Sequence, residues 1–203
     1  MKIGLFGGTF DPIHNAHLFI AESARCLEAL DKVLFVPTNP VHHRAAATAS
    51  AEDRCAMIVL AIASNPGFGL ERIDLDEGAT GYTADLLPRL RAKYPGDEFS
   101  FIIGADSLTS GSWVRMEEVL SNLERFVIAP RAGVPEGAIA RAASAFPSNL
   151  RDRIKTLHLP EIPESSTLVR KLLSEGKSVR YLVPEPVWRY IEEHQLYDVA
   201  ARV

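Results

Sequence analysis

The sequence predicts an α/β protein with a doubly wound, mostly parallel sheet that carries helices on both faces. Apolar runs alternate with helical patterns along the chain, as expected for crossover units. The runs are almost continuously apolar, which is typical of strands that are buried on both sides. With 203 residues, 47% of them hydrophobic, the chain is long enough for one sizeable core. We therefore expect one domain, residues 1–203, with a small helical C-terminal part at 160–203.

Short apolar runs between helical stretches predict the strands. They are expected at residues 2–6, 32–37, 68–73, 99–104 and 125–130, with a last short strand at 153–159. The helices are predicted by apolar spacing and by their start and stop residues. They are expected at 16–30, 51–64 with Ser50 as N-cap, 83–94, 112–123, 136–146, 165–175 and 186–197. Pro88 predicts either a kink or a late start in the third of these helices.

Charge and composition exclude several classes of protein. The net charge of −4 comes from 22 basic and 26 acidic residues spread along the chain, so no basic stripe for nucleic acid is present. No stretch approaches the length of a membrane span, and the amino end lacks the apolar core of a signal peptide. The two cysteines, Cys26 and Cys55, are too few for a disulfide framework and are expected to be buried thiols. A cytoplasmic protein is predicted.

The first chemically informative stretch, GLFGGTFDPIHNAHL, covers residues 4–18. Gly7 and Gly8 follow the first predicted strand, where a missing Cβ lets backbone N–H groups approach a phosphate. In an open parallel sheet, ligands bind beyond the carboxyl ends of the strands, which is where this stretch lies. His14 and His17 are three residues apart, so in one helical turn their rings project to the same side. A capping or packed histidine pair is the alternative explanation.

The second stretch, SSTLVR, covers residues 165–170. Ser165, Ser166 and Thr167 lie at a predicted helix start, where free N–H groups and the helix dipole favour an anion. Arg170, one turn later, can add a bidentate clamp on the same side. An ordinary N-cap with a surface arginine explains the stretch equally simply.

These two stretches, taken with four others, resemble a known family. The others are VPTNPVHHR (36–44), GYTADLL (81–87), FIIGADSLTSGSW (101–113) and YLVPEPVWRYIEEHQLY (181–197). In this order they are similar to the nucleotidyltransferase superfamily with an H-x-G-H signature, specifically the bacterial nicotinate mononucleotide adenylyltransferases. The resemblance covers nearly the whole chain. It implies a Rossmann-like fold and adenylyl transfer from ATP to nicotinate mononucleotide, giving nicotinate adenine dinucleotide and pyrophosphate for NAD biosynthesis.

The resemblance also assigns residues to ATP. His14 and His17 are expected to contact the phosphates and stabilise transition-state charge, while the 160–203 part completes the ATP site with Arg170 as a clamp on the leaving pyrophosphate. Mg²⁺ is expected with ATP, and no side-chain cage for a metal is predicted. The full set expected to bind ATP is Gly7, Gly8, Thr9, Phe10, His17, Gly104, Asp106, Ser165, Ser166, Thr167 and Arg170.

For the mononucleotide the resemblance implies a second set of residues. Thr83 and the loop before it match a segment that receives the nicotinate carboxylate, and Trp113 matches an aromatic residue that stacks on the pyridine ring. The complete set is Asp11, His43, Arg44, Thr83 and Trp113. The chain departs from the family pattern at several positions: Ala16 replaces a glycine, Arg44 a lysine, Val41-His42 two prolines and Glu164 an apolar residue.

Three alternatives stay open. Phosphopantetheine adenylyltransferases share the first motif and a similar SST helix. A transition-metal site could use His14, His17, His42 and His43 with Cys26 or Cys55. A non-catalytic nucleotide-binding regulator is the third. The sequence does not separate nicotinate from nicotinamide mononucleotide, and it leaves a homo-oligomer open.

Overall fold

The computed structural model describes residues 1–38, 47–109, 113–130, 133–144, 146–160 and 162–197. Its sheet is parallel throughout the described residues, with strand order β3-β2-β1-β4-β5-β6. The strands are β1 (Lys2–Gly8), β2 (Lys32–Pro37), β3 (Phe68–Leu70), β4 (Glu98–Gly104), β5 (Arg125–Ala129) and β6 (Ile154–Thr156). The predicted fold class is confirmed.

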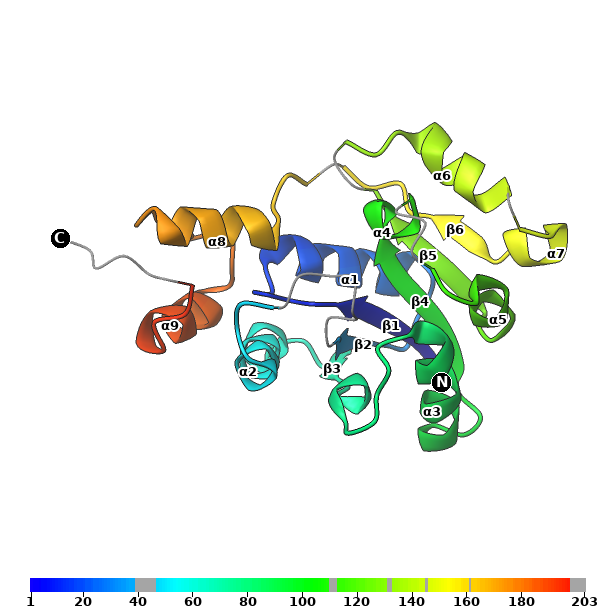
Figure 1. The fold of residues 1–203 in the computed structure, drawn as a ribbon, viewed down its shortest axis with the longest axis horizontal. Helices are drawn as coiled ribbons and strands as arrows, with labels where there is room; N and C mark the ends of the chain where they lie inside the picture. The colour runs from blue at the N-terminus through cyan, green and yellow to red at the C-terminus, as the bar shows by residue number, and fades with distance from the viewer. Residues whose placement is uncertain (39–46, 110–112, 131–132, 145, 161, 198–203) are drawn as a thin grey trace.

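Helices cover both faces of the sheet (Figure 1). One face carries α1 (Asn15–Leu27), α2 (Ala51–Ile62), α8 (Ser166–Ser174) and α9 (Glu185–Glu193). The other carries α3 (Thr83–Lys93), α4 (Ala105–Thr109), α5 (Met116–Ser121), α6 (Glu136–Ser144) and α7 (Ser148–Arg151). A short 3₁₀ helix, η1 (Ile73–Leu75), follows β3 and packs on the same face as α3.

Alternation along the strands divides the core into two layers. Leu5 packs in the layer under α3 and α5, whereas its neighbour Phe6 packs in the layer under α1 and α2. Leu34 and Phe35 of β2 repeat this alternation. Because each face is covered by helices, both sets of side chains are apolar, which explains the continuous apolar runs in the sequence.

The strand order changes direction between β1 and β4. From β1 the chain builds outward through β2 to β3, and from β4 it builds the opposite way through β5 to β6. A crevice forms at such a switch point, beyond the carboxyl ends of the two central strands. Those ends are Gly8 and Gly104, so both predicted glycine segments lie at the same edge of the sheet.

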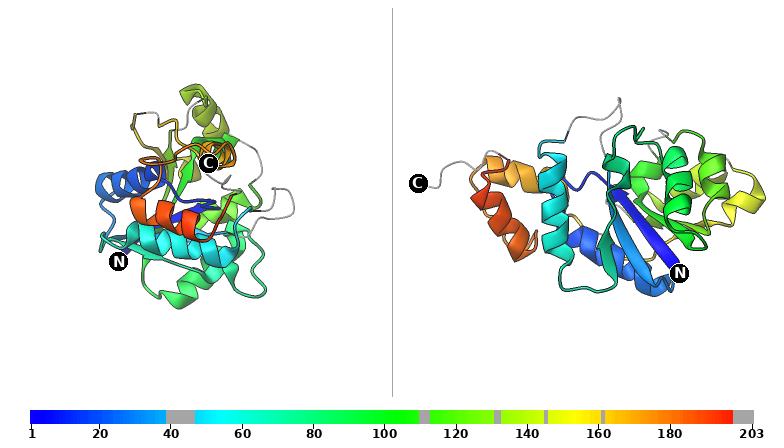
Figure 2. Two further views of the ribbon diagram at one scale, coloured as in Figure 1. Left: turned by 90° about the vertical axis from the view of Figure 1, so that its left-hand side faces the viewer. Right: turned by 90° about the horizontal axis from the view of Figure 1, so that it is seen from below.

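The C-terminal helices share the core of α1 and α2. Val169 and Leu173 of α8 and Val187 and Ile191 of α9 are buried in that same apolar layer. Figure 2 shows α8 and α9 together at one end of the molecule, next to α2. This packing fits the expected single domain, which itself stays a prediction.

Several local predictions were wrong. The strand expected at 68–73 ends at Leu70, and the helix expected from 112 begins at Met116, after Arg115 in a left-handed conformation (φ 54°). Helix α3 starts at Thr83 and runs through Pro88, so the late start is excluded. The short helices α4 and α7 were not predicted. Cys26 is exposed, whereas Cys55 is buried as expected. No helix in the described ranges is long and apolar enough to cross a membrane.

Candidate functional site

The site begins at the glycine turn, defined here as residues 7–12, where the chain leaves β1. A Cβ on Gly7 would lie 2.8 Å from the ring of Phe101, and one on Gly8 would lie 3.0 Å from the ring of Phe10. Phe10 itself has a positive φ of 50°. The glycines therefore let two aromatic rings close against the end of the strand, which keeps the turn's backbone near the crevice.

The two histidines form the start of α1. His14 is the N-cap residue, and its backbone N–H donates to Nδ1 of His17 over 3.2 Å. The two rings stack with their centroids 3.7 Å apart and their planes at 27°. The expectation that both rings lie on one side is thus confirmed. Because Nδ1 of His17 accepts, a neutral ring carries its proton on Nε2, which makes Nε2 a hydrogen-bond donor.

Aromatic side chains fix the orientation of His17. The ring of Phe10 meets it edge-on at 5.0 Å and the ring of Phe6 at 5.9 Å. His14 is almost fully buried. A ring that is held by a backbone hydrogen bond on one side and by phenyl rings on another cannot rotate freely, so its donor nitrogen keeps one direction.

The hydroxyl motif, residues 165–170, lies directly beside the glycine turn. Ser165 caps α8 by accepting from Leu168 N over 3.2 Å. The Ser166 hydroxyl donates to the Pro12 carbonyl over 2.9 Å, and Nη1 of Arg170 donates to the Asp11 carbonyl over 2.6 Å. The two motifs are therefore neighbours in the fold. This arrangement places the positive end of a helix dipole and a guanidinium next to the histidine pair.

Asp11 is buried beneath this junction. Its Oδ1 accepts from Ala49 N over 3.0 Å and from the Tyr197 hydroxyl over 2.8 Å, and its Oδ2 accepts from Thr48 N over 2.7 Å. Nη1 of Arg170 lies 3.8 Å from Oδ2. These contacts join the glycine turn to the segment before α2 and to the C-terminal end of the chain. A role of Asp11 toward the mononucleotide stays a prediction.

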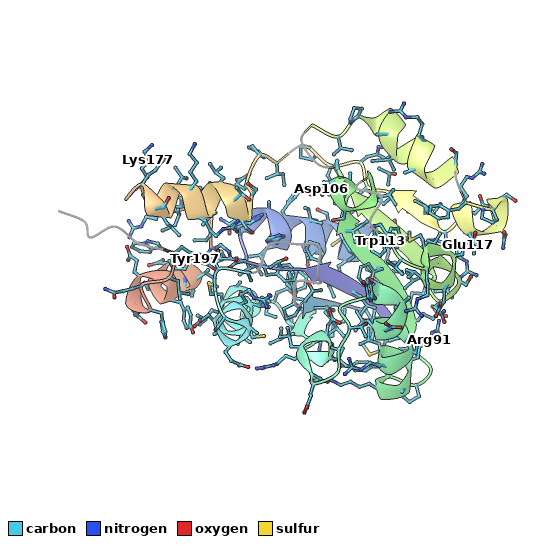
Figure 3. All side chains as sticks on the ribbon, in the orientation of Figure 1. Arg91, Asp106, Trp113, Glu117, Lys177 and Tyr197 are labelled. Carbon is cyan, nitrogen blue, oxygen red and sulfur yellow. The ribbon has the colours of Figure 1, made fainter. Side chains whose placement is uncertain are left out.

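The residues expected around adenosine lie at the end of β4. The Asp106 carboxylate folds back over Gly104, because a Cβ on this glycine would lie 2.5 Å from Oδ1 of Asp106. Asp106 itself is exposed on α4, at the upper edge of the sheet (Figure 3). Thr167 is exposed at the start of α8. Thr9 is half-buried, and its carbonyl accepts a hydrogen bond from Arg54.

The residues expected around the mononucleotide are more widely placed. Thr83 is the first residue of α3, and its side chain is half-buried. Trp113 donates from Nε1 to the Ser107 carbonyl over 2.8 Å and packs edge-on against Phe101, the ring that also touches the position of Gly7. His43 and Arg44 lie outside the described residues.

Arg54 is a functional candidate that sequence reasoning missed. It is 1% exposed, and its Nη1 donates to the carbonyls of Thr9 (2.6 Å) and Thr38 (3.1 Å). Thr38 N also donates to the Gly8 carbonyl over 3.0 Å. Burial lowers the pKa of Arg54. In the sequence, Arg54 lies four residues before Ile58, on the apolar face of the predicted helix. A charged residue on that face was the one indication that Arg54 is buried and has a polar role.

Tyr197 was the second residue missed. It is 6% exposed, and its hydroxyl reaches Asp11 from the last described residue of the chain. Burial, together with the Asp11 carboxylate, raises its pKa. A tyrosine at the end of an amphipathic helix pattern is normally explained by packing in the core. The sequence therefore gave no indication of this hydrogen bond to Asp11.

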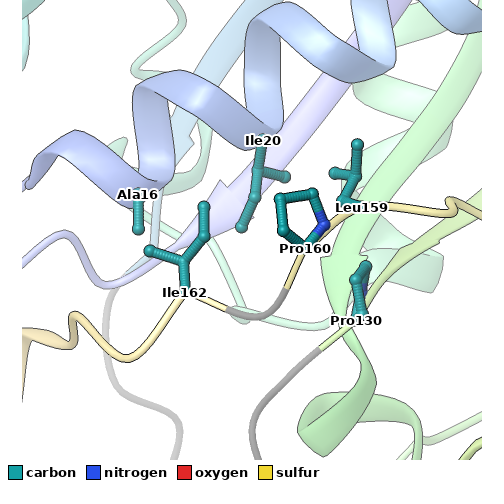
Figure 4. A pocket seen from close by; sticks show the side chains of 6 residues that line it. All are labelled: Ala16, Ile20, Pro130, Leu159, Pro160 and Ile162. Carbon is teal, nitrogen blue, oxygen red and sulfur yellow. The ribbon is translucent and has the colours of Figure 1, made fainter.

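An apolar hollow lies beside the histidine pair. It is lined by Ala16 and Ile20 of α1, Pro130 after β5, and Leu159, Pro160 and Ile162 before α8 (Figure 4). It is shallow, with room for about one water molecule. Its walls offer an apolar surface and no partner for a charged group.

Within the described ranges, no group of three histidine, cysteine, aspartate or glutamate side chains is placed to hold a metal ion. Of the residues in the metal-site alternative, His42 and His43 lie outside those ranges.

Comparison with known proteins gives the following findings. Residues 5–172 match the model of the cytidylyltransferase-like family. A protein of Exiguobacterium sibiricum, named "Probable nicotinate-nucleotide adenylyltransferase", is 39% identical over 97% of this chain and 99% of its own length. One of Mycolicibacterium vanbaalenii with the same name is 41% identical over 97% and 92%. The structure of the Plasmodium falciparum nicotinic acid mononucleotide adenylyltransferase complexed with NaAD superposes with a TM-score of 0.79 at 20% identity, covering 99% of both chains.

Proposed function

Because the chain belongs to the cytidylyltransferase-like family, and within it to the nicotinate-nucleotide adenylyltransferases, we propose that this nucleotidyltransferase joins the adenylyl group of ATP to nicotinate mononucleotide. The products are nicotinate adenine dinucleotide and pyrophosphate. One observation carries the proposal: Ser166 and Arg170 of α8 are hydrogen-bonded to the backbone of the glycine turn. Groups that suit a triphosphate therefore come together from the two ends of the chain.

The phosphates of ATP lie between these two segments in our proposal. Nε2 of His17, with His14 stacked on it, faces the α-phosphate and stabilises the charge of the transition state. The β- and γ-phosphates meet the N-terminus of α8 and Arg170. Backbone N–H groups at Gly7, Gly8, Thr9 and Phe10 complete the contact.

The adenosine end of ATP lies on the other side of the histidine pair. The adenine ring packs over the shallow apolar hollow between Ile20, Leu159 and Ile162, next to α1. Gly104 and Asp106, at the end of the neighbouring central strand, lie toward the ribose. A carboxylate is a good acceptor for sugar hydroxyls.

The mononucleotide is assigned to the opposite side of the crevice. Trp113 offers a ring for the pyridine, and the first turn of α3 at Thr83 offers the positive end of a helix to a carboxylate. This polarity favours nicotinate over the uncharged nicotinamide. Asp11 serves this side by holding Thr48 and Ala49, and His43 and Arg44 reach for the phosphate.

Mg²⁺ enters with ATP in this proposal. It would be bound chiefly by the triphosphate that it accompanies. The ion supplies charge neutralisation on the triphosphate.

The chemistry is a single displacement. An oxygen of the mononucleotide phosphate attacks the α-phosphorus of ATP, a new P–O bond forms in line with the breaking one, and the electron pair leaves with pyrophosphate. A phosphate monoester is already a nucleophile near neutral pH, so positioning and charge stabilisation are sufficient. One displacement inverts the configuration at the α-phosphorus. With chiral ATPαS, retention would indicate a covalent enzyme intermediate and contradict this mechanism.

Pyrophosphate release tests the proposed function. The chain is incubated with ATP and Mg²⁺ together with nicotinate mononucleotide, nicotinamide mononucleotide or phosphopantetheine. We expect the highest kcat/KM with nicotinate mononucleotide. Preference for phosphopantetheine would support the alternative adenylyltransferase, and ATP binding without pyrophosphate release would support the regulator.

Two free cysteines fit the reducing cytoplasm, to which we assign the enzyme.

A further inference from the structure

The junction between the glycine turn and α8 contains a potential conflict of charge. Arg170 Nη1 donates to the Asp11 carbonyl over 2.6 Å, and the same nitrogen lies 3.8 Å from the Asp11 carboxylate. The carboxylate is thus close to an ion pair with the guanidinium but beyond hydrogen-bond distance. In the proposed function this guanidinium must serve a phosphate instead.

Neutral donors already occupy the carboxylate. Thr48 N and Ala49 N each donate to one of its oxygens, and the Tyr197 hydroxyl donates to Oδ1 over 2.8 Å. Asp11 is 4% exposed and Tyr197 6%, so water cannot easily replace a missing donor. A buried carboxylate that loses a donor attracts the nearest cation more strongly. Here that cation is Arg170, at 3.8 Å, because the buried Arg54, which also interacts with the carboxylate, is bound to the carbonyls of Thr9 and Thr38.

We propose that Tyr197 is a positioning residue: its hydroxyl occupies the Asp11 carboxylate and so leaves Arg170 available for the triphosphate of ATP. The inference rests on the proposed function, because it takes Arg170 as a phosphate ligand. It assigns a specific task to Tyr197, which Figure 3 shows between α8 and α9.

The chain offers a matched control. Tyr190, on α9, also donates its hydroxyl to an aspartate, Oδ1 of Asp53, over 3.0 Å. That aspartate belongs to the cap of α2 and has no contact with Arg170 among the hydrogen bonds and ion pairs of the described residues. Tyr190→Phe and Tyr197→Phe therefore remove the same group from the same part of the chain. Only the second change alters the donors of Asp11.

Calorimetric titration with Mg-ATP measures the Kd for ATP of the two variants, Tyr197→Phe and Tyr190→Phe. We expect Tyr197→Phe to raise the Kd for ATP about tenfold, the effect of one hydrogen bond to a charged group, and Tyr190→Phe to leave it within twofold. Urea unfolding of both variants shows whether they are folded. Equal Kd values for Tyr197→Phe and the wild type, or equal losses in both variants, would overturn the proposal. Absence of ATP binding by the wild type would instead overturn the proposed function itself.

Two further variants test the route through Arg170. In an Arg170→Ala background, Tyr197→Phe should weaken ATP binding by less than about twofold, because the guanidinium to be captured is gone. A full tenfold loss there would overturn the proposal. Tyr197→p-aminophenylalanine keeps an N–H donor at the same position, so it should fold and restore the wild-type Kd even if Tyr197→Phe does not fold. A Kd about tenfold above wild type in this folded variant would overturn the proposal.

Discussion

Replacing Arg54 by methionine removes the charge beneath the glycine turn while keeping most of the side-chain volume. In the wild type, Nη1 of Arg54 donates to the carbonyl of Thr9 over 2.6 Å and to that of Thr38 over 3.1 Å. Its Nε has no hydrogen-bond partner within the described part of the chain. The variant leaves both carbonyl oxygens without this donor, at the place where the turn adjoins the end of β2.

These two hydrogen bonds determine how much stability the Arg54→Met variant loses. A hydrogen bond from a charged donor contributes about 1.5–3 kcal/mol, so the pair contributes about 3–6 kcal/mol. Removal of a buried cation, whose pKa burial lowers and whose Nε is unpaired, returns about 1–3 kcal/mol. Taking the middle of each range, we expect Arg54→Met to lower the free energy of unfolding by about 2–3 kcal/mol. For a chain of this size that corresponds to a melting temperature lower by about 4–12 °C.

Urea unfolding at neutral pH measures this loss. Arg72→Met is the control. Arg72 forms a surface ion pair with Glu52, which lies on α2 as Arg54 does, and the two paired side chains are 48% and 73% exposed. Such a pair contributes about 0–1 kcal/mol. A loss below about 1 kcal/mol for Arg54→Met, or equal losses in both variants, would refute the reasoning.

Three other changes have definite expected results. Burial raises the pKa of Asp74 from 3.8 to about 6. The folded state therefore holds this proton more tightly, and stability declines as pH rises from about 4 to about 6. Asp74→Asn should be more stable than the wild type by up to about 3 kcal/mol at neutral pH, with no difference in urea unfolding below about pH 4. His17→Ala should lower kcat about a hundredfold or more without unfolding the chain, and a near-normal kcat would contradict its role. Ile20→Trp covers the shallow apolar hollow with a larger side chain, so the KM for ATP should rise about tenfold while the KM for the mononucleotide is unchanged. Equal changes in both constants would exclude adenine from the hollow.

The sequence was sufficient for the fold because the strands are buried on both faces. Runs such as KVLFVP at 32–37 have no polar side to obscure the pattern, and their alternation with helical stretches leaves few topologies. Shorter elements were missed for a physical reason. The strand expected to reach residue 73 stops at Leu70, where the chain turns into a 3₁₀ helix that packs under α3. Such an end depends on tertiary contacts, which local periodicity does not contain.

The candidate site could be inferred from the sequence where it depends on backbone geometry. Two glycines after a strand predict a close backbone approach, and hydroxyl residues at a helix start predict an N-cap. Both inferences need only the local sequence. Arg54 and Tyr197 were not predictable in this way. The Arg54 guanidinium binds Thr9, 45 residues away along the chain, and the Tyr197 hydroxyl binds Asp11, 186 residues away. Only the folded chain brings these partners together.

The account depends most on a single triphosphate that contacts both ends of the chain. A crystal structure with a non-hydrolysable ATP analogue tests this directly. We expect the α-phosphate within hydrogen-bond distance of Nε2 of His17, and the terminal phosphates at the backbone N–H groups of Ser166 and Thr167 and at Arg170. An analogue whose phosphates touch only one of these segments, or neither, would contradict the account.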